Sequence, residues 1–427
     1  MIGIVLLLTF AVMMIIGVPI AISLGLSTIV AIVYSGDYSV LSAVHRMASG
    51  VDSYILMAIP FFILAGQLMN TGGITRKIFS FATALVGRIP GGLGHSNIVA
   101  SIIFSGMSGS AVADAGGLGQ VEMKAMTEAG YDPEFSAAVT TASATIGPII
   151  PPSIPMIVYG AAAEVSVGAL FLGGFIPGLL LGLACMVIVL IISLRRNYPR
   201  AERFEIRTVI RTFKESFLSL LTPVIIIGGI LGGIFTPTEA AVVAAVYAFI
   251  LGVVVYKEIT IRDLKKILID TVVTSASVIF IISAATAFSW VIAMEGIPQQ
   301  VADMILSVTS NKFIILLILN IVFLILGMFM ESLSILLITV PFLLPLVDAT
   351  GISPVHLGVV IVLNLMIGLS TPPVGMSLFV TSKISGVPLE RLYKEILPFL
   401  IPLIAVLLII SYVPGTVMWL PKIFLGY

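Results

Sequence analysis

Two carboxylates, Asp114 and Glu331, stand among serine and glycine residues inside otherwise apolar stretches of the sequence. Asp114 belongs to FSGMSGSAVADAGG (residues 104–117), and Glu331 belongs to GMFMESLS (residues 327–334). A polar group without a partner costs several kcal/mol in lipid, so such segments must be shielded by protein or line a hydrated cavity. Because carboxylates at membrane depth are usually functional, these segments are the first candidates for a binding site.

Each of these segments is followed by one in which proline and glycine interrupt an apolar run. TIGPIIPPS (residues 145–153) follows the first, and IGLSTPPVG (residues 367–375) follows the second. Proline frees carbonyls on the preceding turn, and glycine lets the chain bend and approach closely. Freed carbonyls and hydroxyls suit a small cation, whereas the N-termini of half-helices favour a substrate carboxylate. One architecture would therefore bind both a cation and an organic anion.

The predicted ligands come from all four segments. For any single serine or threonine the alternative is helix packing, since such residues are common where membrane helices meet. Asp114 and Glu331 could instead lie in water at a hairpin tip. Lys383 could instead anchor its helix at the membrane interface. The predicted Na⁺ ligands are Ser105, Ser108, Ser110, Asp114, Thr145, Gly147, Gly327, Glu331, Ser332, Gly368, Ser370 and Thr371, and the predicted substrate contacts are Pro151, Pro152, Pro372, Pro373 and Lys383.

The composition indicates the elements that position these residues. The chain of 427 residues is 59% hydrophobic and 10% charged, with a mean hydropathy of +1.21. Soluble domains are roughly a quarter charged, so we expect an all-α protein with many membrane spans. The net charge is zero, and no basic stripe points to nucleic acid. The single Cys185 permits no disulfide framework or cysteine-based metal site, and we expect no cofactor besides Na⁺ as a coupling ion.

A shift of the sequence by 221 positions brings helix-breaking residues of the two halves into register. Corresponding interrupted segments in two repeats are typical of secondary transporters, whose site lies where the repeats meet near the middle of the membrane. The alternative is a chance alignment in a membrane protein that contains many glycines and prolines. The matched pairs include Gly106 and Gly327, Gly147 and Gly368, Pro151-Pro152 and Pro372-Pro373, and Pro177 and Pro398.

The basic residues predict opposite orientations for the two repeats, because lysine and arginine crowd cytoplasmic loops. Arg195–Lys214 carries seven of them and Lys257–Lys266 carries four, so both loops are predicted to be cytoplasmic. The turn Phe235–Glu239 would then lie outside. Ser35–Ser53 carries one arginine against two aspartates and fits the outer face. The repeats are therefore predicted to be inverted.

We divide the chain into four parts on these grounds. Residues 1–53 would form the scaffold part of the first repeat, with two short spans that separate at Gly17–Pro19 and a surface helix; residues 54–194 would form its transport part. Residues 195–270 would hold the cytoplasmic loop and the scaffold part of the second repeat, and 271–427 its transport part. Asp37–Ser53 and Lys257–Asp270 are predicted to lie along the membrane surface. A polar connector is predicted to reach one surface with Glu122, Lys124, Glu128, Asp132 and Glu134.

The segments FSGMSGSAVADAGGLGQVEMKAMTEAGYDPEFSAAVTTASATIGPIIPPSIPMIVYG (residues 104–160) and IGLSTPPVGMSLFVTSKISGVPLE (residues 367–390) resemble the large membrane subunit, M type, of tripartite ATP-independent periplasmic (TRAP) transporters. The resemblance extends over the whole chain. It implies a multi-pass protein of a bacterial or archaeal inner membrane that imports organic acids with Na⁺ by an elevator mechanism. C4-dicarboxylates, sialic acid and other sugar acids are the implied substrates.

The resemblance also implies two protein partners. One is a small four-helix Q subunit, expected here as a separate polypeptide because the sequence starts at the first span of the large subunit. The other is a soluble periplasmic substrate-binding protein that delivers the organic acid.

Two other functions are compatible with parts of the sequence. A stand-alone secondary dicarboxylate symporter would need no binding protein, and the residues alone do not separate it from a TRAP subunit. GMSG (residues 106–109) also matches the GxSG nucleophile pattern of rhomboid-type intramembrane serine proteases. Ser108 would be the nucleophile, with His95 or His356 as a candidate base. A protease would leave the two repeats unexplained.

Overall fold

The computed structural model describes residues 2–200 and 205–427, and within these ranges every regular element is a helix. Met1 and residues 201–204, which belong to the predicted first span and to the predicted cytoplasmic loop, lie outside the described residues. Seven of the described helices are long and apolar enough to cross a membrane, and a pair bent by 69° would provide an eighth span. The structure confirms an all-α protein with many apolar spans.

The first half of the chain contains eleven α-helices in its described part, several of them short. They are α1 (Ile2–Ile15), α2 (Ile20–Ser35), α3 (Val40–Ser49), α4 (Ala58–Thr71), α5 (Ile74–Val86), α6 (Gly92–Ser108), α7 (Ala111–Gly116), α8 (Leu118–Glu128), α9 (Pro133–Ala144), α10 (Ile154–Ala162) and α11 (Val167–Arg196). The separate α1 and α2 confirm the predicted break at Gly17–Pro19. Gly17 has a φ of +85°, which L side chains rarely adopt.

The second half, as far as it is described, has ten α-helices and includes the longest one, α14. They are α12 (Ile206–Leu231), α13 (Pro237–Phe249), α14 (Ile261–Met294), α15 (Ile297–Val308), α16 (Lys312–Phe329), α17 (Ser332–Thr350), α18 (Pro354–Leu369), α19 (Met376–Ser385), α20 (Leu389–Tyr412) and α21 (Gly415–Leu425). A π-helical stretch, Ile250–Val255, continues α13.

The helix boundaries confirm the predicted repeat. Moving α6 along by 221 positions gives residues 313–329, and α16 spans Lys312–Phe329. The same shift moves the start of α9 to residue 354, where α18 begins, and the start of α10 to 375, one residue before α19. The opposite orientation of the two repeats in the membrane stays a prediction.

Both predicted interruptions are present. Residues 145–153 separate α9 from α10, and residues 370–375 separate α18 from α19. We call these segments the first and second break. The backbone N–H of Met156 donates to Ser153 Oγ (3.2 Å), which fixes the start of α10 after the first break. The Pro-Pro bonds at 151–152 and 372–373 are both cis.

Each hairpin turns at its predicted polar tip. In the first hairpin, α6 ends at Ser108 and α7 begins at Ala111. Gly109 between them has a φ of +64°, and a Cβ there would lie 2.7 Å from the Pro152 carbonyl oxygen. In the second hairpin, Met330 and Glu331 separate α16 from α17. Both tips are therefore set by local backbone requirements, while their depth in the membrane stays a prediction.

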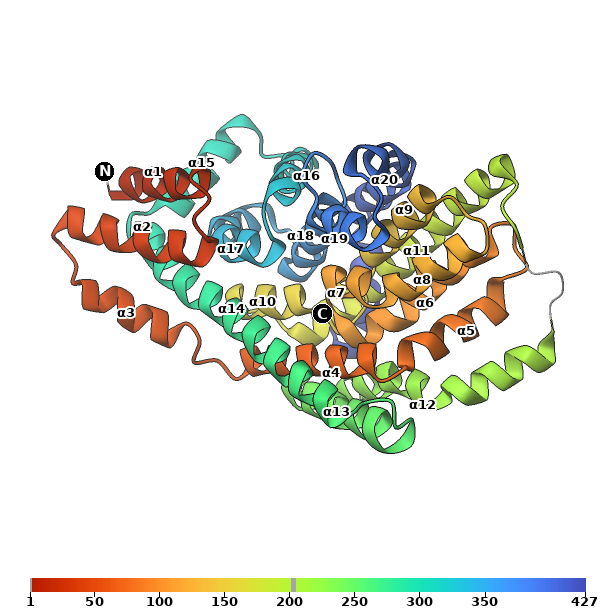
Figure 1. Ribbon diagram of the computed structural model, residues 1–427. Coiled ribbons are helices and arrows are strands. Elements are labelled where there is room, and N and C mark those ends of the chain that lie inside the picture. The colour runs from red at the N-terminus through yellow and green to blue at the C-terminus, as the bar shows by residue number, and fades with distance from the viewer. Residues whose placement is uncertain (1, 201–204) are drawn as a thin grey trace.

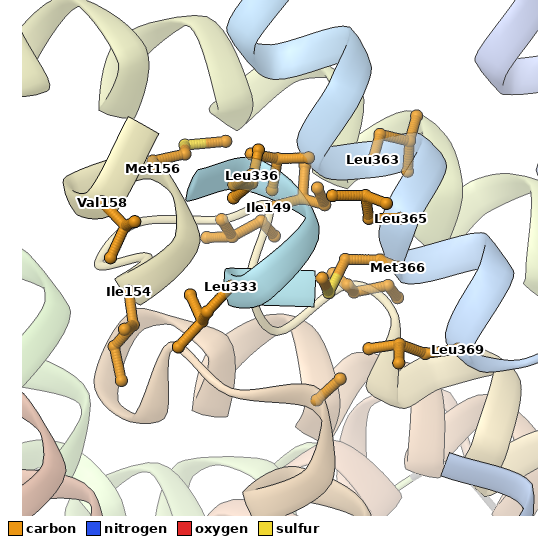
Figure 2. Packing of buried hydrophobic residues seen from close by; sticks show 14 of the residues in the cluster. Ile149, Ile154, Met156, Val158, Leu333, Leu336, Leu363, Leu365, Met366 and Leu369 are labelled. Carbon is orange, nitrogen blue, oxygen red and sulfur yellow. The ribbon is translucent and has the colours of Figure 1, made fainter. Parts of the chain in front are cut away.

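Helix α14 crosses the molecule obliquely, and α2, α3, α4 and α17 all pack against it (Figure 1). On the other side, α18 lies in the interior and is buried at every residue after Pro354. Figure 2 shows the apolar packing where the repeats meet, with side chains of the first break (Ile149), of α17 (Leu333, Leu336) and of α18 (Met366, Leu369) in one cluster. The first break is buried, whereas the second break is buried at Ser370, Thr371 and Gly375 and exposed at Pro373.

Two surface predictions are wrong in part. The segment Lys257–Asp270 is not a separate surface helix, because Ile261–Asp270 forms the first turns of the 34-residue α14. Helix α14 therefore passes through the predicted domain boundary at 270/271 without a break. Glu122 does not reach the surface with the rest of its connector, since it is 1% exposed. The predicted helix within Asp37–Ser53 is present as the separate α3.

Candidate functional site

The tips of both hairpins line a single cavity of about 360 Å³. Ser108 and Ser110 come from the first tip, and Glu331 and Ser332 come from the second. The remaining wall is built from the first break, from residues on either side of the second break, and from α4 and α14. Among the further lining residues are Pro148, Ile154 and Pro155 at the first break, Met366, Leu369 and Met376 beside the second, Gln67 and Asn70 of α4, and Thr274 and Ser277 of α14.

At the first tip, Ser108 and Asp114 hold each other. Ser108 Oγ donates to Asp114 Oδ1, and both side chains are at least 97% buried. The other oxygen, Asp114 Oδ2, is buried without a hydrogen-bond partner among the described residues. It lies against the first break, because a Cβ on Gly147 would come within 2.1 Å of it. A buried carboxylate oxygen without a donor is a ready ligand for a cation.

At the second tip, Glu331 is the N-cap of α17. Its Oε2 accepts from the backbone N–H of Ser334 (3.1 Å), and its Oε1 accepts from Ser332 Oγ (3.2 Å). The cap satisfies one of the free donors at the helix start and places the carboxylate at the cavity. A negative group is also favoured at this position by the helix dipole.

The tips are attached to the breaks by matching backbone contacts. Ile154 N–H donates to the Gly109 carbonyl (3.4 Å) in the first repeat, and Gly375 N–H donates to the Met328 carbonyl (3.0 Å) in the second. Ile154 and Gly375 are themselves 221 positions apart. Each hairpin tip is therefore held by a residue at the end of its own break.

Further contacts join α9, which precedes the first break, to the second break and to α19. Ser370 Oγ donates to the Thr141 carbonyl (3.3 Å), and the hydroxyls of Thr141 and Thr381 lie 2.8 Å apart. Within the second repeat, Gly327 of α16 and Gly368 of α18 approach closely, since a Cβ on Gly368 would lie 2.7 Å from the Gly327 Cα. The hydroxyl contacts therefore connect the two repeats, and none of these residues lines the cavity.

Three of the predicted hydroxyl ligands are occupied within their own helices. Ser105 Oγ donates to the Ser101 carbonyl (2.5 Å), Thr145 Oγ1 to Ala142 (2.7 Å) and Thr371 Oγ1 to Ile367 (2.7 Å). A hydroxyl that donates backwards still presents lone pairs to a ligand, so Thr145 and Thr371 at the breaks stay candidates for cation binding.

The predicted substrate residues lie around the cavity and not in its wall. Pro151 lines a different, apolar cavity, and Pro152 is buried against Gly109. Pro372 is half-buried, and exposed Pro373 accepts a hydrogen bond from Tyr393 Oη (2.5 Å). Lys383 lies near the end of α19 and is exposed. The prolines that do line the cavity are Pro148 and Pro155.

Sequence reasoning missed the polar residues on the unbroken side of the cavity. Gln67 and Asn70 of α4 and Thr274 and Ser277 of α14 all line it, and Asn70 Oδ1 is buried without a partner among the described residues. Each pair is spaced by three residues and so occupies one face of its helix. Two polar residues at this spacing within an apolar helix are the sequence signal that would have indicated these cavity residues.

The geometry does not support a serine protease. Ser108 Oγ donates to Asp114, and His356 Nε2 lies 2.7 Å from the Ile410 carbonyl oxygen. A serine nucleophile requires a base within hydrogen-bond reach of its hydroxyl. Within residues 2–200 and 205–427, no histidine contact to Ser108 is present.

Two matched halves, each with a hairpin and an interrupted helix, that meet at one cavity with several polar side chains in its wall define a membrane transporter. Residues 7–416 match the family described as "Tripartite ATP-independent periplasmic transporter, DctM component". The chain belongs to this family of transporter permeases, which are not enzymes.

Named relatives cover nearly the whole chain. It is 48% identical over 411 residues to the sialic acid TRAP transporter large permease protein SiaM of Vibrio cholerae, covering 96% of each chain. It is 41% identical over 400 residues to the C4-dicarboxylate TRAP transporter large permease protein DctM of Pseudomonas aeruginosa, covering 94% of each. The solved structure of the YdaH transporter of Alcanivorax borkumensis has a TM-score of 0.63 over 88% of this chain and 87% of that one. At 13% identity, that likeness shows the fold alone.

Proposed function

We propose that this chain is the large membrane subunit of a Na⁺-coupled importer of an organic acid. Sialic acid and C4-dicarboxylates are the favoured substrates, because the two relatives described above are named as transporters of these compounds. The observation that supports the proposal is the single cavity shared by both hairpin tips, with Glu331 in its wall and Asp114 directly behind Ser108.

Na⁺ binding follows from the partners of the two carboxylates. Asp114 Oδ2 is buried at the first break without a donor among the described residues, so a cation there would compensate its charge. Glu331 accepts from two donors at the start of α17 and still faces the cavity. Carbonyls and hydroxyls at the breaks would complete each coordination shell.

Substrate binding follows from the helix ends. The first residues of α10 and α17 border the cavity, and a helix N-terminus favours a carboxylate. None of the lining residues that the structure describes is lysine or arginine. The charge of an organic acid would thus be balanced by bound Na⁺ and helix ends, which couples substrate affinity to Na⁺.

Movement by an elevator mechanism is part of the same proposal. The hairpins and breaks would move as one body, since contacts between Ser370 and Thr141 and between Thr141 and Thr381 join them. They would slide against α4 and α14, which form the opposite wall of the cavity. This proposal places α4 and residues 271–294 of α14 on the stationary side, whereas the division by sequence assigns both to the transport parts. A four-helix Q-type subunit and a periplasmic binding protein are the proposed partners, in a bacterial inner membrane.

Reconstitution tests the proposal. The chain would be placed in proteoliposomes with the small subunit and the binding protein, and uptake of labelled sialic acid and succinate would be measured. We expect accumulation of one of them under an inward Na⁺ gradient and none under a K⁺ gradient. Equal uptake without Na⁺ would refute coupling, and uptake by this chain alone would favour a stand-alone symporter.

A further inference from the structure

A second cavity lies beside the first break and contains no polar wall among the described residues. It has a volume of about 220 Å³ and is lined by residues of α11, α12 and α21 together with Pro151. Phe171 and Leu172 of α11, Ile230 of α12 and Leu420 of α21 are among its lining residues. Since none of the described lining residues carries a polar side chain, the cavity is purely apolar.

Such a cavity does not hold ordered water. A buried water needs two to four polar partners, and an engineered apolar cavity of about 150 Å³ stays dry and binds benzene. The cavity beside α11 is larger than that and offers only hydrocarbon contacts. Its natural occupant is therefore an apolar group.

The mouth of the cavity is continuous with the lipid-facing surface. Phe175 of α11 is 36% exposed and Phe424 of α21 is 54% exposed, and both line the cavity. The same α11 and α12 are membrane spans with further exposed apolar side chains, such as Leu183 and Val224. An acyl chain can therefore enter from the bilayer without crossing polar surface.

Helix α21 also carries residues typical of the membrane interface. Leu420 and Phe424 line the cavity from one face of α21. Trp419 and Tyr427 on the same segment are exposed, as is typical of residues at the level of the headgroups. The end of α12 at Leu231 leads to the turn that is predicted to lie outside.

We propose that this cavity binds one acyl chain of a phospholipid of the outer leaflet. The first break borders both cavities: Pro148, Ile154 and Pro155 face the candidate site, and Pro151 faces the apolar cavity. The bound chain thus packs directly against the segment that shapes the candidate site. This inference stands on the apolar cavity and does not depend on the transported substrate.

Photolabelling of the full-length protein tests the proposal. It would be reconstituted in vesicles of phosphatidylethanolamine and phosphatidylglycerol, with a trace of phosphatidylglycerol that carries a diazirine at the end of one acyl chain. We expect the label in peptides that contain Phe171–Phe175, Ile227–Leu231 and Leu420–Phe424. Leu172→Trp fills the cavity and should lower labelling about tenfold, because excluding two methylene groups removes roughly that much affinity.

Two further variants keep the test decisive. Gly168→Leu fills the same cavity without a backbone clash, since the nearest atom to a Cβ there is Ile230 Cγ2 at 3.7 Å. Leu183→Trp is the matched control on α11, because Leu183 is 60% exposed and lies outside the cavity. Labelling that is absent from the three segments, or equal in both filled variants and the control, would overturn the proposal.

Discussion

At the residue scale, the two acidic groups of the candidate site differ in what satisfies them. Glu331 accepts hydrogen bonds at the start of α17, whereas Asp114 has one oxygen bonded by Ser108 and the other without a donor among the described residues. The two positions therefore respond differently to substitution. A glutamine at position 331 would remove the charge and keep the size of the side chain. The position of the Asp114 carboxylate depends on the absence of a side chain at Gly147, which it approaches closely.

The first prediction concerns Glu331→Gln. Loss of the negative charge at the cavity wall should raise the Na⁺ concentration for half-maximal uptake about tenfold, because a charge-assisted contact is worth about 1.5–3 kcal/mol. Glu128→Gln is the control, since the Glu128 side chain is 69% exposed and lies on α8 outside the cavity. An unchanged Na⁺ dependence in Glu331→Gln would remove this carboxylate from the site.

The second prediction concerns Gly147→Ala. The added Cβ would meet Asp114 Oδ2 at 2.1 Å and push the carboxylate away from the break. We expect the Na⁺ concentration for half-maximal uptake to rise about tenfold, with Ser108→Ala acting in the same direction. A variant that binds Na⁺ as tightly as the unmodified protein in a titration would show that Asp114 is a packing residue.

At the element scale, one close helix crossing and one ion pair hold neighbouring elements together. Gly327 and Gly368 let α16 and α18 of the second repeat approach, and Arg196 at the end of α11 connects α20 to the start of α9. The Arg196 guanidinium donates to both oxygens of Glu395 (2.8 and 3.0 Å) and to Asp132 (3.2 Å). Close backbone packing thus acts within the second repeat, whereas the branched ion pair joins elements of different repeats.

The third prediction tests the helix crossing. Gly368→Ala places a Cβ 2.7 Å from the Gly327 Cα, so α16 and α18 must separate. We expect a loss of roughly 1–3 kcal/mol, measured as a lower melting temperature in detergent. Gly228→Ala is the control, because nothing lies within 4 Å of its Cβ. Equal melting temperatures of the two variants would contradict the close crossing.

The fourth prediction tests the ion pair. Arg196→Gln leaves Glu395 and Asp132 without their cation and should destabilise the protein by about 1 kcal/mol, less at high salt. Arg211→Gln is the control, since its pair with Glu215 spans 4.0 Å and both side chains are more than half exposed. If both variants have the same melting temperature at low salt, the Arg196 network contributes no stability.

At the scale of the whole molecule, the candidate site lies where two kinds of element meet. The hairpin tips, the first break and residues beside the second break form one side of the cavity, and α4 and α14 form the other. Helix α14 also packs on α2 and α3, so it connects the cavity to the N-terminal helices (Figure 1). Any displacement of the hairpins would change the cavity.

The fifth prediction follows from this division. A bifunctional thiol reagent that joins Ser277→Cys of α14 to Ser332→Cys of the second tip should abolish uptake, because it fixes the two walls of the cavity. Each single cysteine variant is a control, and the native Cys185 is buried. Full uptake in the joined protein, with the cross-link confirmed by mass spectrometry, would exclude sliding along α14.

The sequence alone determined the elements and the chemistry of the site. Proline and glycine interrupt helices through their own backbone chemistry, so the residue types were enough to locate the breaks, both hairpin tips and the register of 221 positions. A carboxylate among apolar residues points to a candidate site for a similarly local reason, and the structure places Ser108 and Glu331 in the cavity wall with Asp114 bonded to Ser108. Their role in Na⁺ binding stays a prediction.

Only the tertiary structure decided which residues share a cavity. Gln67, Asn70, Thr274 and Ser277 lie in unbroken helices, and their packing against the tips depends on contacts between distant parts of the chain. The same holds for Glu122, whose burial depends on how α8 packs. It also holds for Lys257–Asp270, because the helix that begins at Ile261 continues without interruption as α14. A break in a helix is encoded by the residues at the break. The direction in which a side chain points and its burial depend instead on how two elements pack against each other.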